Sequence, residues 1–172
     1  MKFCSIILAR GGSKGLPGKN IIEFCEKPLL AWTIEHCIEG RATPVYVSSD
    51  SENILEVGEQ YGAKSILRPE NISGDYATSE SGWLHALGII EAELGSIDWV
   101  LAPQVTSPLR SKDDIRNGLK LAESGKYDSL FSSCLADDMF IWERDGGKLK
   151  SINYDFRKRP RRQDFKDGYI IE

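Results

Sequence analysis

The sequence has little of the features that mark several other classes of protein. Histidine occurs twice, and the cysteines form no C-x-x-C pair; they are Cys4, Cys25, Cys37 and Cys134. We therefore expect free thiols, as in a reducing cytoplasm, rather than disulfides or a metal site. No apolar run approaches the roughly 18 residues that span a membrane, and the N-terminus lacks the pattern of a signal peptide. The net charge of −4 leaves no overall basic surface for nucleic acid. These absences predict a cytoplasmic protein without nucleic-acid or membrane partners.

Catalytic arrangements built on histidine are also missing. His36 and His85 both lie in expected helices among apolar neighbours, where packing or a surface position is the favoured interpretation. No Ser-His-Asp or Cys-His arrangement is recognisable. This absence suits a mechanism without a covalent enzyme intermediate.

The sequence does contain a regular alternation of short apolar runs and helical patterns. The apolar runs predict strands at residues 2–8, 44–49, 63–67, 97–102 and 127–134. Helices are expected at residues 28–40, 51–62, 79–94 and 113–124, with Asp50 or Ser51 as the cap of the second helix. This alternation predicts an α/β fold with a doubly wound, mostly parallel sheet. Beyond residue 134, apolar segments on both sides of Asp145-Gly146-Gly147 predict a β-hairpin.

The most unusual stretch is the loop Ala9–Asn20, which directly follows the first expected strand. It combines four glycines with the cations Arg10, Lys14 and Lys19. Glycines let backbone N–H groups approach an anion closely, and ligands of open α/β sheets bind at the carboxyl ends of strands. The spacing fits neither the Walker motif nor G-x-G-x-x-G. A flexible basic turn is the alternative, but the position favours a loop that binds a polyphosphate, such as a nucleoside triphosphate.

Two further segments follow expected strands. In the first, Arg68-Pro69 precedes Ser73–Ser79. A guanidinium there can donate to acceptor atoms of a ligand, and the alternative is an exposed arginine with a helix cap at Ser79. In the second, Gln104 opens the run Gln-Val-Thr-Ser-Pro-Leu-Arg. A glutamine there hydrogen-bonds a sugar hydroxyl without adding charge, and the alternative is a turn capped by Ser111.

A fourth segment, Arg159–Asp164, is strongly basic. A run of charges is usually a solvated surface. An arginine also pairs well with a carboxylate, however, and Arg161 or Arg162 could bind an acidic ligand in this way.

In this order, the loop and the three segments resemble the signature of the acylneuraminate cytidylyltransferases, the CMP-sialic acid synthetases. The resemblance spans nearly all 172 residues. It implies a Rossmann-like nucleotide-diphospho-sugar transferase fold in which the hairpin is a dimerisation element. It also implies transfer of CMP from CTP to an acidic nine-carbon keto-sugar, an N-acylneuraminate, with release of pyrophosphate and with Mg²⁺ as the cofactor. The resemblance further implies that Arg68 and Ser79 lie near the cytosine and ribose, where a guanidinium donates to the O2 and N3 acceptors of cytosine. It implies as well that Arg161 or Arg162 pairs with the carboxylate of the acidic sugar. The expected partners are CTP, the acidic sugar and a second copy of the chain.

On this interpretation the chain has three parts. They are a nucleotide-binding α/β domain at 1–134, a hairpin and basic segment for dimerisation and the sugar site at 135–165, and the start of a returning strand at 166–172. The expected catalytic residues are Arg10, Lys14 and Lys19. The expected nucleotide-binding residues are Gly11, Gly12, Ser13, Asn20, Arg68 and Ser79. The expected substrate-binding residues are Gln104, Arg161 and Arg162.

One part of the family pattern is not found. The resemblance implies that an Asp-x-Asp-type pair in the family's final part holds the magnesium ion, whereas this sequence stops at Glu172. We therefore expect no metal ligands in this chain and a sequence that lacks the family's C-terminal part. Two alternatives stay open. One is activation of a related sugar acid, namely legionaminic acid, pseudaminic acid or Kdo. The other is a non-catalytic, nucleotide-binding remnant. No general base is evident from the sequence.

Overall fold

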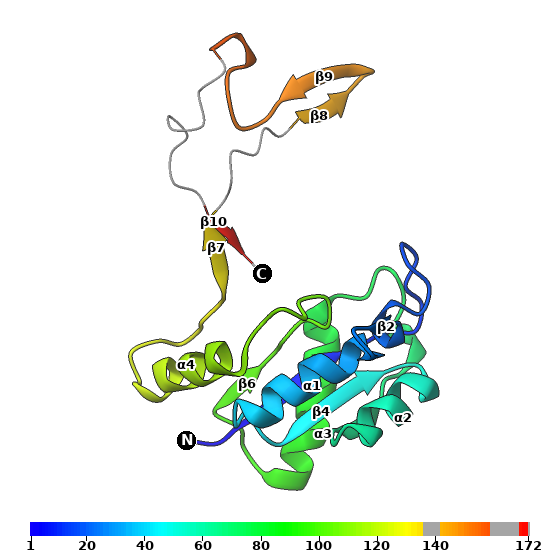
Figure 1. The fold of residues 1–172 in the computed structure, drawn as a ribbon, viewed down its shortest axis with the longest axis vertical. Coiled ribbons are helices and arrows are strands. Elements are labelled where there is room, and N and C mark those ends of the chain that lie inside the picture. The colour runs from blue at the N-terminus through cyan, green and yellow to red at the C-terminus, as the bar shows by residue number, and fades with distance from the viewer. Residues whose placement is uncertain (136–141, 159–168, 172) are drawn as a thin grey trace. The chain divides into compact units, whose positions relative to one another are not determined.

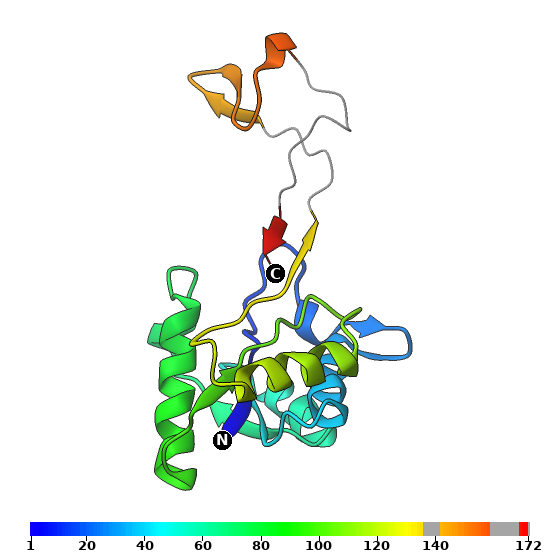
Figure 2. The same cartoon turned by 90° about the vertical axis from the view of Figure 1, so that its left-hand side faces the viewer.

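The computed structural model describes residues 1–135, 142–158 and 169–171 (Figures 1 and 2). The chain divides into two compact units, Met1–Ser129 and Leu130–Glu172. Each unit is described by itself.

A four-stranded parallel sheet forms the centre of the first unit. Its strands, in spatial order, are β5 (Lys64–Leu67), β4 (Val45–Ser49), β1 (Phe3–Leu8) and β6 (Trp99–Leu101). Ser5 of β1 lies opposite Val45 on one side and Leu101 on the other. Consecutive residues in the middle of β1 are fully buried. A strand is buried in this way only when both faces of the sheet are covered, as in doubly wound folds.

Helices cover both faces of this sheet. Their bounds are α1 (Leu29–Glu39), α2 (Glu52–Gln60), α3 (Ser79–Leu94) and α4 (Lys112–Glu123). Ile7 of β1 packs in a cluster with Ile34, Ile54 and Ile115, which come from α1, α2 and α4. Its neighbour Ile6 faces the other way and belongs to the cluster of α3 (Figures 1 and 2). The predicted doubly wound α/β fold is therefore confirmed.

The N-termini of three helices test the caps that the sequence offered. Ser111 caps α4, as one interpretation of that turn had it, and it forms a capping box with Asp114, with N–H···O distances of 3.2 and 2.8 Å. Ser51 is the N-cap residue of α2, as expected, although its side chain makes no capping hydrogen bond. The N-cap of α3 is Thr78, whose hydroxyl accepts from the N–H of Ser81 at 3.2 Å. The alternative interpretation of Ser79 as a helix cap was therefore wrong.

Short elements join the main ones. They are the 3₁₀ turns η1 (Lys19–Ile21) and η2 (Glu70–Ile72) and the paired strands β2 (Glu23–Phe24) and β3 (Lys27–Pro28). The β2–β3 pair brings the chain from the glycine-rich loop to α1. Within the described residues, no helix is both long and apolar enough to cross a membrane.

The second unit contains two antiparallel pairs. In the hairpin of β8 (Trp142–Asp145) and β9 (Lys148–Ser151), Asp145 lies opposite Lys148. The two turn residues, Gly146 and Gly147, have φ of +53° and +82°, which is the left-handed region that a two-residue hairpin turn requires. The predicted hairpin is confirmed. The other pair is β7 (Ser133–Leu135) with β10 (Tyr169–Ile171), and η3 (Phe156–Lys158) follows the hairpin.

The prediction of a fifth parallel strand at residues 127–134 was wrong. Only its last residues form a strand, β7, and this strand pairs antiparallel with β10 instead of extending the parallel sheet. Residues 127–133 are exposed, and Asp128, Ser129 and Ser132 interrupt the apolar side chains. A strand buried on both faces needs a nearly continuous apolar run, which this segment does not have.

Candidate functional site

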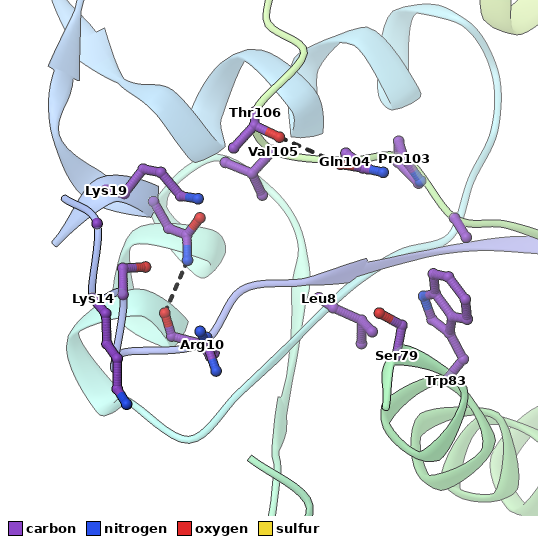
Figure 3. Close-up of a pocket in the computed structure, with 14 residues that line it drawn as sticks. Leu8, Arg10, Lys14, Lys19, Ser79, Trp83, Pro103, Gln104, Val105 and Thr106 are labelled. Carbon is purple, nitrogen blue, oxygen red and sulfur yellow. Dashed lines mark hydrogen bonds between the residues drawn. The ribbon is translucent and has the colours of Figure 1, made fainter. Parts of the chain in front are cut away.

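A pocket of about 350 Å³ opens at the carboxyl ends of β1 and β6 (Figure 3). From β1 the chain proceeds to β4 and β5 on one side, and it then returns to place β6 on the other side. A crevice forms where the strand order reverses in this way, because the connections leave the sheet in opposite directions. The glycine-rich loop and the segment that begins at Gln104 leave these two strands, so both reach the same pocket.

Most of the sequence-predicted site residues line this pocket. They are Arg10, Ser13, Lys14, Lys19, Asn20, Ser79 and Gln104. Arg68 lines a neighbouring pocket, also of about 350 Å³, which shares Leu8, Arg10 and Ser79 with the first. Neither of these two pockets includes Gly11 or Gly12 in its lining. Arg161 and Arg162 lie outside the described residues.

Asn20 holds the glycine-rich loop in place. This residue is 6% exposed, and its Nδ2 donates to the carbonyl oxygen of Arg10 at 2.9 Å (Figure 3). Gly18, just before η1, has φ of +67°, which favours glycine. The buried amide therefore fixes the backbone that carries Arg10.

Two of the three cations of the loop, Arg10 and Lys14, share one carboxylate. The Arg10 guanidinium lies 3.3 Å from one oxygen of Asp75, and the Lys14 ammonium lies 2.5 Å from the other. The hydrogen bond from Lys14, more than the charge of Arg10, lowers the pKa of Asp75. Asp75 follows η2, in the same segment as Ser79. A carboxylate from that segment thus sits against the cations expected to bind phosphate.

Arg68 is a buried cation at the wall of the second pocket. It is 6% exposed; its Nε donates to the hydroxyl of Ser73 at 3.0 Å, and its Nη2 lies 4.0 Å from Asp50. Burial lowers the pKa of Arg68, the nearby Asp50 carboxylate opposes this shift, and the Arg10 charge adds to it. Arginine nonetheless stays protonated at neutral pH, so the guanidinium is a fixed donor group beside the pocket.

The backbone of Gln104 is fixed by a hydrogen bond and by its buried neighbour. The carbonyl oxygen of Gln104 accepts from Arg110 Nη2 at 3.0 Å, and the next residue, Val105, is 4% exposed in the core. The Gln104 side-chain oxygen accepts from the Thr106 hydroxyl at 3.4 Å, as Figure 3 shows. Its amide nitrogen is a donor at the pocket.

Sequence reasoning missed three residues near these pockets. Trp83 lines the first pocket, and Asp75 lines the second. Asp50 accepts from the N–H of Gly11 at 2.9 Å. Two signals were available: Trp83 lies four residues after Ser79, on the same helix face, and Asp50 follows β4, whose carboxyl end lies at the same edge of the sheet as that of β1.

The described residues contain no group of three or more His, Cys, Asp or Glu side chains that could hold a metal ion. The donor set within residues 1–135, 142–158 and 169–171 therefore does not fit a metal site made by the protein alone. Burial raises the pKa of the Cys4 and Cys37 thiols to about 11, so neither supplies a thiolate at neutral pH.

Comparison with known proteins assigns the chain to a family. The model of a family described as "Cytidylyltransferase" matches residues 4–137, which is most of the chain.

The chain belongs to the cytidylyltransferase family.

Two curated cytidylyltransferases illustrate the relationship. The pseudaminic acid cytidylyltransferase of Campylobacter jejuni is 38% identical over 135 residues, which cover 77% of this chain and 58% of that protein. The N-acylneuraminate cytidylyltransferase A of Danio rerio is 32% identical over 173 residues, which cover 98% of this chain and 39% of that protein. The chain thus spans little more than half the length of the first relative and less than half that of the second.

A solved structure agrees on the fold. The structure of CMP:2-keto-3-deoxy-manno-octonic acid synthetase complexed with CTP superposes with a TM-score of 0.60, at 20% identity, and covers 72% of this chain and 48% of that one. At this identity the likeness extends to the fold alone, which is the Rossmann-like fold of nucleotidyltransferases.

Proposed function

We propose that this cytidylyltransferase-family chain transfers CMP from CTP to an acidic nine-carbon keto-sugar, an N-acylneuraminate, and releases pyrophosphate. The observation that carries the proposal is the first pocket, which lies where the strand order reverses. There, the cations of the glycine-rich loop lie opposite Ser79 and Gln104, two neutral hydrogen-bonding residues from other segments. Cations for phosphates and neutral donors for hydroxyls are the groups that a nucleotide and a sugar require.

The chemical step is a displacement at phosphorus. The anomeric hydroxyl of the sugar forms a bond to the α-phosphorus of CTP and loses its proton, while the bond from that phosphorus to the bridging oxygen breaks and pyrophosphate leaves. Charge on the leaving phosphates must be offset. Arg10, Lys14 and Lys19 offset it, and the Asn20 amide holds the loop that presents Arg10.

Arg68, Ser79 and Asn20 bind the nucleoside in this proposal. Cytosine presents O2 and N3 as adjacent acceptors, whereas uracil presents an N–H at position 3. A guanidinium that only donates therefore favours cytosine over uracil. The buried position of Arg68 restricts its side chain and supports this reading of the base. Gly11, Gly12 and Ser13 bring the loop backbone close to the phosphates.

The sugar acid contacts Gln104, and its carboxylate pairs with Arg161 or Arg162, which lie outside the described residues. Pseudaminic acid is the second candidate substrate. It is favoured by the Campylobacter jejuni relative, of which this chain covers a larger share than it does of the Danio rerio protein. Both candidates are acidic nine-carbon sugars, so the same cations would serve either.

A divalent cation, Mg²⁺ in this proposal, accompanies the triphosphate and would neutralise part of its charge. Among the described residues no group of three or more His, Cys, Asp or Glu side chains could hold such an ion. We also propose that the chain acts as a cytoplasmic homodimer, with contacts made by the β8–β9 hairpin and the segment that follows it.

The proposal is tested with the 172-residue chain, CTP, Mg²⁺ and a panel of sugar acids. Pyrophosphate release with an N-acylneuraminate is the expected result, and faster release with pseudaminic acid would select the second candidate. Calorimetry with CTP, UTP, ATP and GTP measures nucleotide preference separately from turnover. The proposed function fails if the chain neither binds CTP in preference to the other nucleotides nor releases pyrophosphate with any acid of the panel.

A further inference from the structure

Asp50 connects two parts of the site that come from different strands. It follows the carboxyl end of β4, which lies between β1 and β5 in the sheet. One of its oxygens, Oδ1, accepts from the N–H of Gly11 at 2.9 Å, and the same oxygen lies 4.0 Å from Nη2 of Arg68. A single carboxylate oxygen thus contacts the glycine-rich loop on one side and the buried guanidinium on the other.

Glycine at position 11 allows the loop to approach Asp50 closely. A Cβ placed on Gly11 would lie 3.0 Å from the Cβ of Ser51, closer than side chains normally pack. The backbone of the loop therefore lies against the residues that follow β4, and the amide of Gly11 donates to the Asp50 carboxylate. This close packing is a structural reason for a glycine at position 11, which lines neither of the two pockets.

Arg68 needs a counter-charge at this place. At 6% exposure it has lost nearly all of its water, and burying an unpaired charge is costly. Its Nε is held by Ser73, whose hydroxyl in turn donates to the carbonyl oxygen of Pro69 at 2.8 Å. These neutral groups orient one edge of the guanidinium. Asp50 supplies the negative charge beside the other edge.

We propose that Asp50 is a positioning residue that fixes the base-reading Arg68 and the phosphate-binding loop relative to each other. The proposal rests on the proposed function for the roles of these two parts, and it adds a residue that contacts neither base nor phosphate. If this is so, base preference and phosphate binding both depend on the Asp50 carboxylate, but each depends on a different property of it. The charge of Asp50 acts on Arg68, whereas its acceptor oxygen acts on Gly11.

Two substitutions separate these contributions. Asp50→Asn keeps an oxygen that accepts from Gly11 but removes the charge beside Arg68, whereas Asp50→Ala removes both. Glu52→Gln is the matched control, because it removes one negative charge two residues away, on the exposed first turn of α2. All three variants are made in the full 172-residue chain and compared with the wild type.

The first measurement needs no nucleotide. In ¹⁵N NMR spectra of the free protein, Asp50→Asn should shift the Arg68 Nε–H resonance and speed its hydrogen exchange, while the Gly11 amide stays protected. Asp50→Ala should change both signals, and Glu52→Gln should change neither.

The second measurement is calorimetry with CTP, UTP and pyrophosphate. Asp50→Asn should reduce the preference for CTP over UTP by about tenfold, as expected when a buried guanidinium loses its partner charge, and should leave pyrophosphate affinity unchanged. Asp50→Ala should weaken pyrophosphate binding as well.

The outcomes distinguish this proposal from the proposed function. If Asp50→Asn matches Glu52→Gln in the Arg68 resonance and in base preference, Asp50 does not position Arg68 and the proposal is overturned. A wild-type chain that shows no preference for CTP contradicts the proposed function instead, and the NMR comparison in the free protein still decides whether Asp50 positions Arg68. Equal losses of CTP, UTP and pyrophosphate binding in Asp50→Asn would indicate a general structural role and would also overturn the proposal.

Discussion

At the scale of single residues, the loop cations are the first test of the phosphate site. Lys14→Ala and Lys19→Ala should each weaken CTP binding by about 1.5–3 kcal/mol, because each removes a charge-assisted hydrogen bond to phosphate. Calorimetry measures the change. Lys126→Ala, which removes an exposed cation beyond α4, is the control and should have no effect. Unchanged CTP affinity in both loop variants would remove the loop from the nucleotide site.

Asp75 should compete with phosphate for the same cations. It contacts both Arg10 and Lys14, so a bound triphosphate has to displace it. Asp75→Asn should therefore raise pyrophosphate affinity a few-fold in low-salt calorimetry, whereas Glu70→Gln, an exposed change nearby, should leave it unaltered. Weaker binding in Asp75→Asn would show instead that the carboxylate helps to hold the ligand.

The same contact has a defined dependence on pH. Lys14 lowers the pKa of Asp75, so the carboxylate stays charged throughout the neutral range. A depressed carboxyl pKa contributes stability above the unfolded-state value, and this contribution is lost as pH falls through the folded-state value. The affinity difference between the wild type and Asp75→Asn should accordingly persist at neutral pH and shrink only in acid, below the ordinary range of an aspartate.

At the scale of elements, helix α3 packs closely against the Arg68 side chain at Gly82, which has no side chain of its own. A Cβ on Gly82 would lie 3.1 Å from Nη1 of Arg68 and 3.2 Å from a methyl carbon of Leu8. Gly82→Ala should displace the guanidinium and weaken CTP binding. Gly88 is on the same helix with nothing within 4 Å of its added Cβ, so Gly88→Ala should raise the free energy of unfolding by about 1 kcal/mol through helix propensity alone.

Denaturant unfolding and CTP calorimetry on both glycine variants separate packing from propensity. If Gly82→Ala gains the same stability as Gly88→Ala and binds CTP as the wild type does, α3 does not confine Arg68. These two variants also test the nucleotide site without substituting a charged residue.

At the scale of the whole molecule, the hairpin is the element expected to join two copies of the chain. Trp142 and Leu149 of the hairpin and Ile152, which directly follows it, are 41%, 65% and 57% exposed, so a short two-stranded element and its next residue present large apolar side chains to solvent. Static light scattering at micromolar concentration should show a dimer that Leu149→Asp converts to a monomer. Leu84→Asp changes an equally exposed leucine on α3 and should remain dimeric. A monomeric wild type would contradict the proposed dimer.

Local signals in the sequence predicted most of the fold. The run of apolar residues in β1, the capping box of Ser111 and Asp114, and the glycine pair at the hairpin turn each depend on neighbours in the chain. The glycine-rich loop was recognisable for the same reason, since its composition and its place after a strand are both local. The strand expected at 127–134 was wrong because Asp128, Ser129 and Ser132 interrupt its apolar residues, and a strand buried on both faces of a parallel sheet needs a nearly continuous apolar run.

The sequence alone predicts an α/β protein with a cationic glycine-rich loop after its first strand, and it shows which segments follow the other strands. How these segments meet is seen only in the folded chain. Asp50 and Asp75 are separated in sequence from the loop that they contact, and the order of the strands brings their carboxylates to it. A short-range pattern cannot specify such pairs, because distances between strand ends are set by the packing of the sheet as a whole.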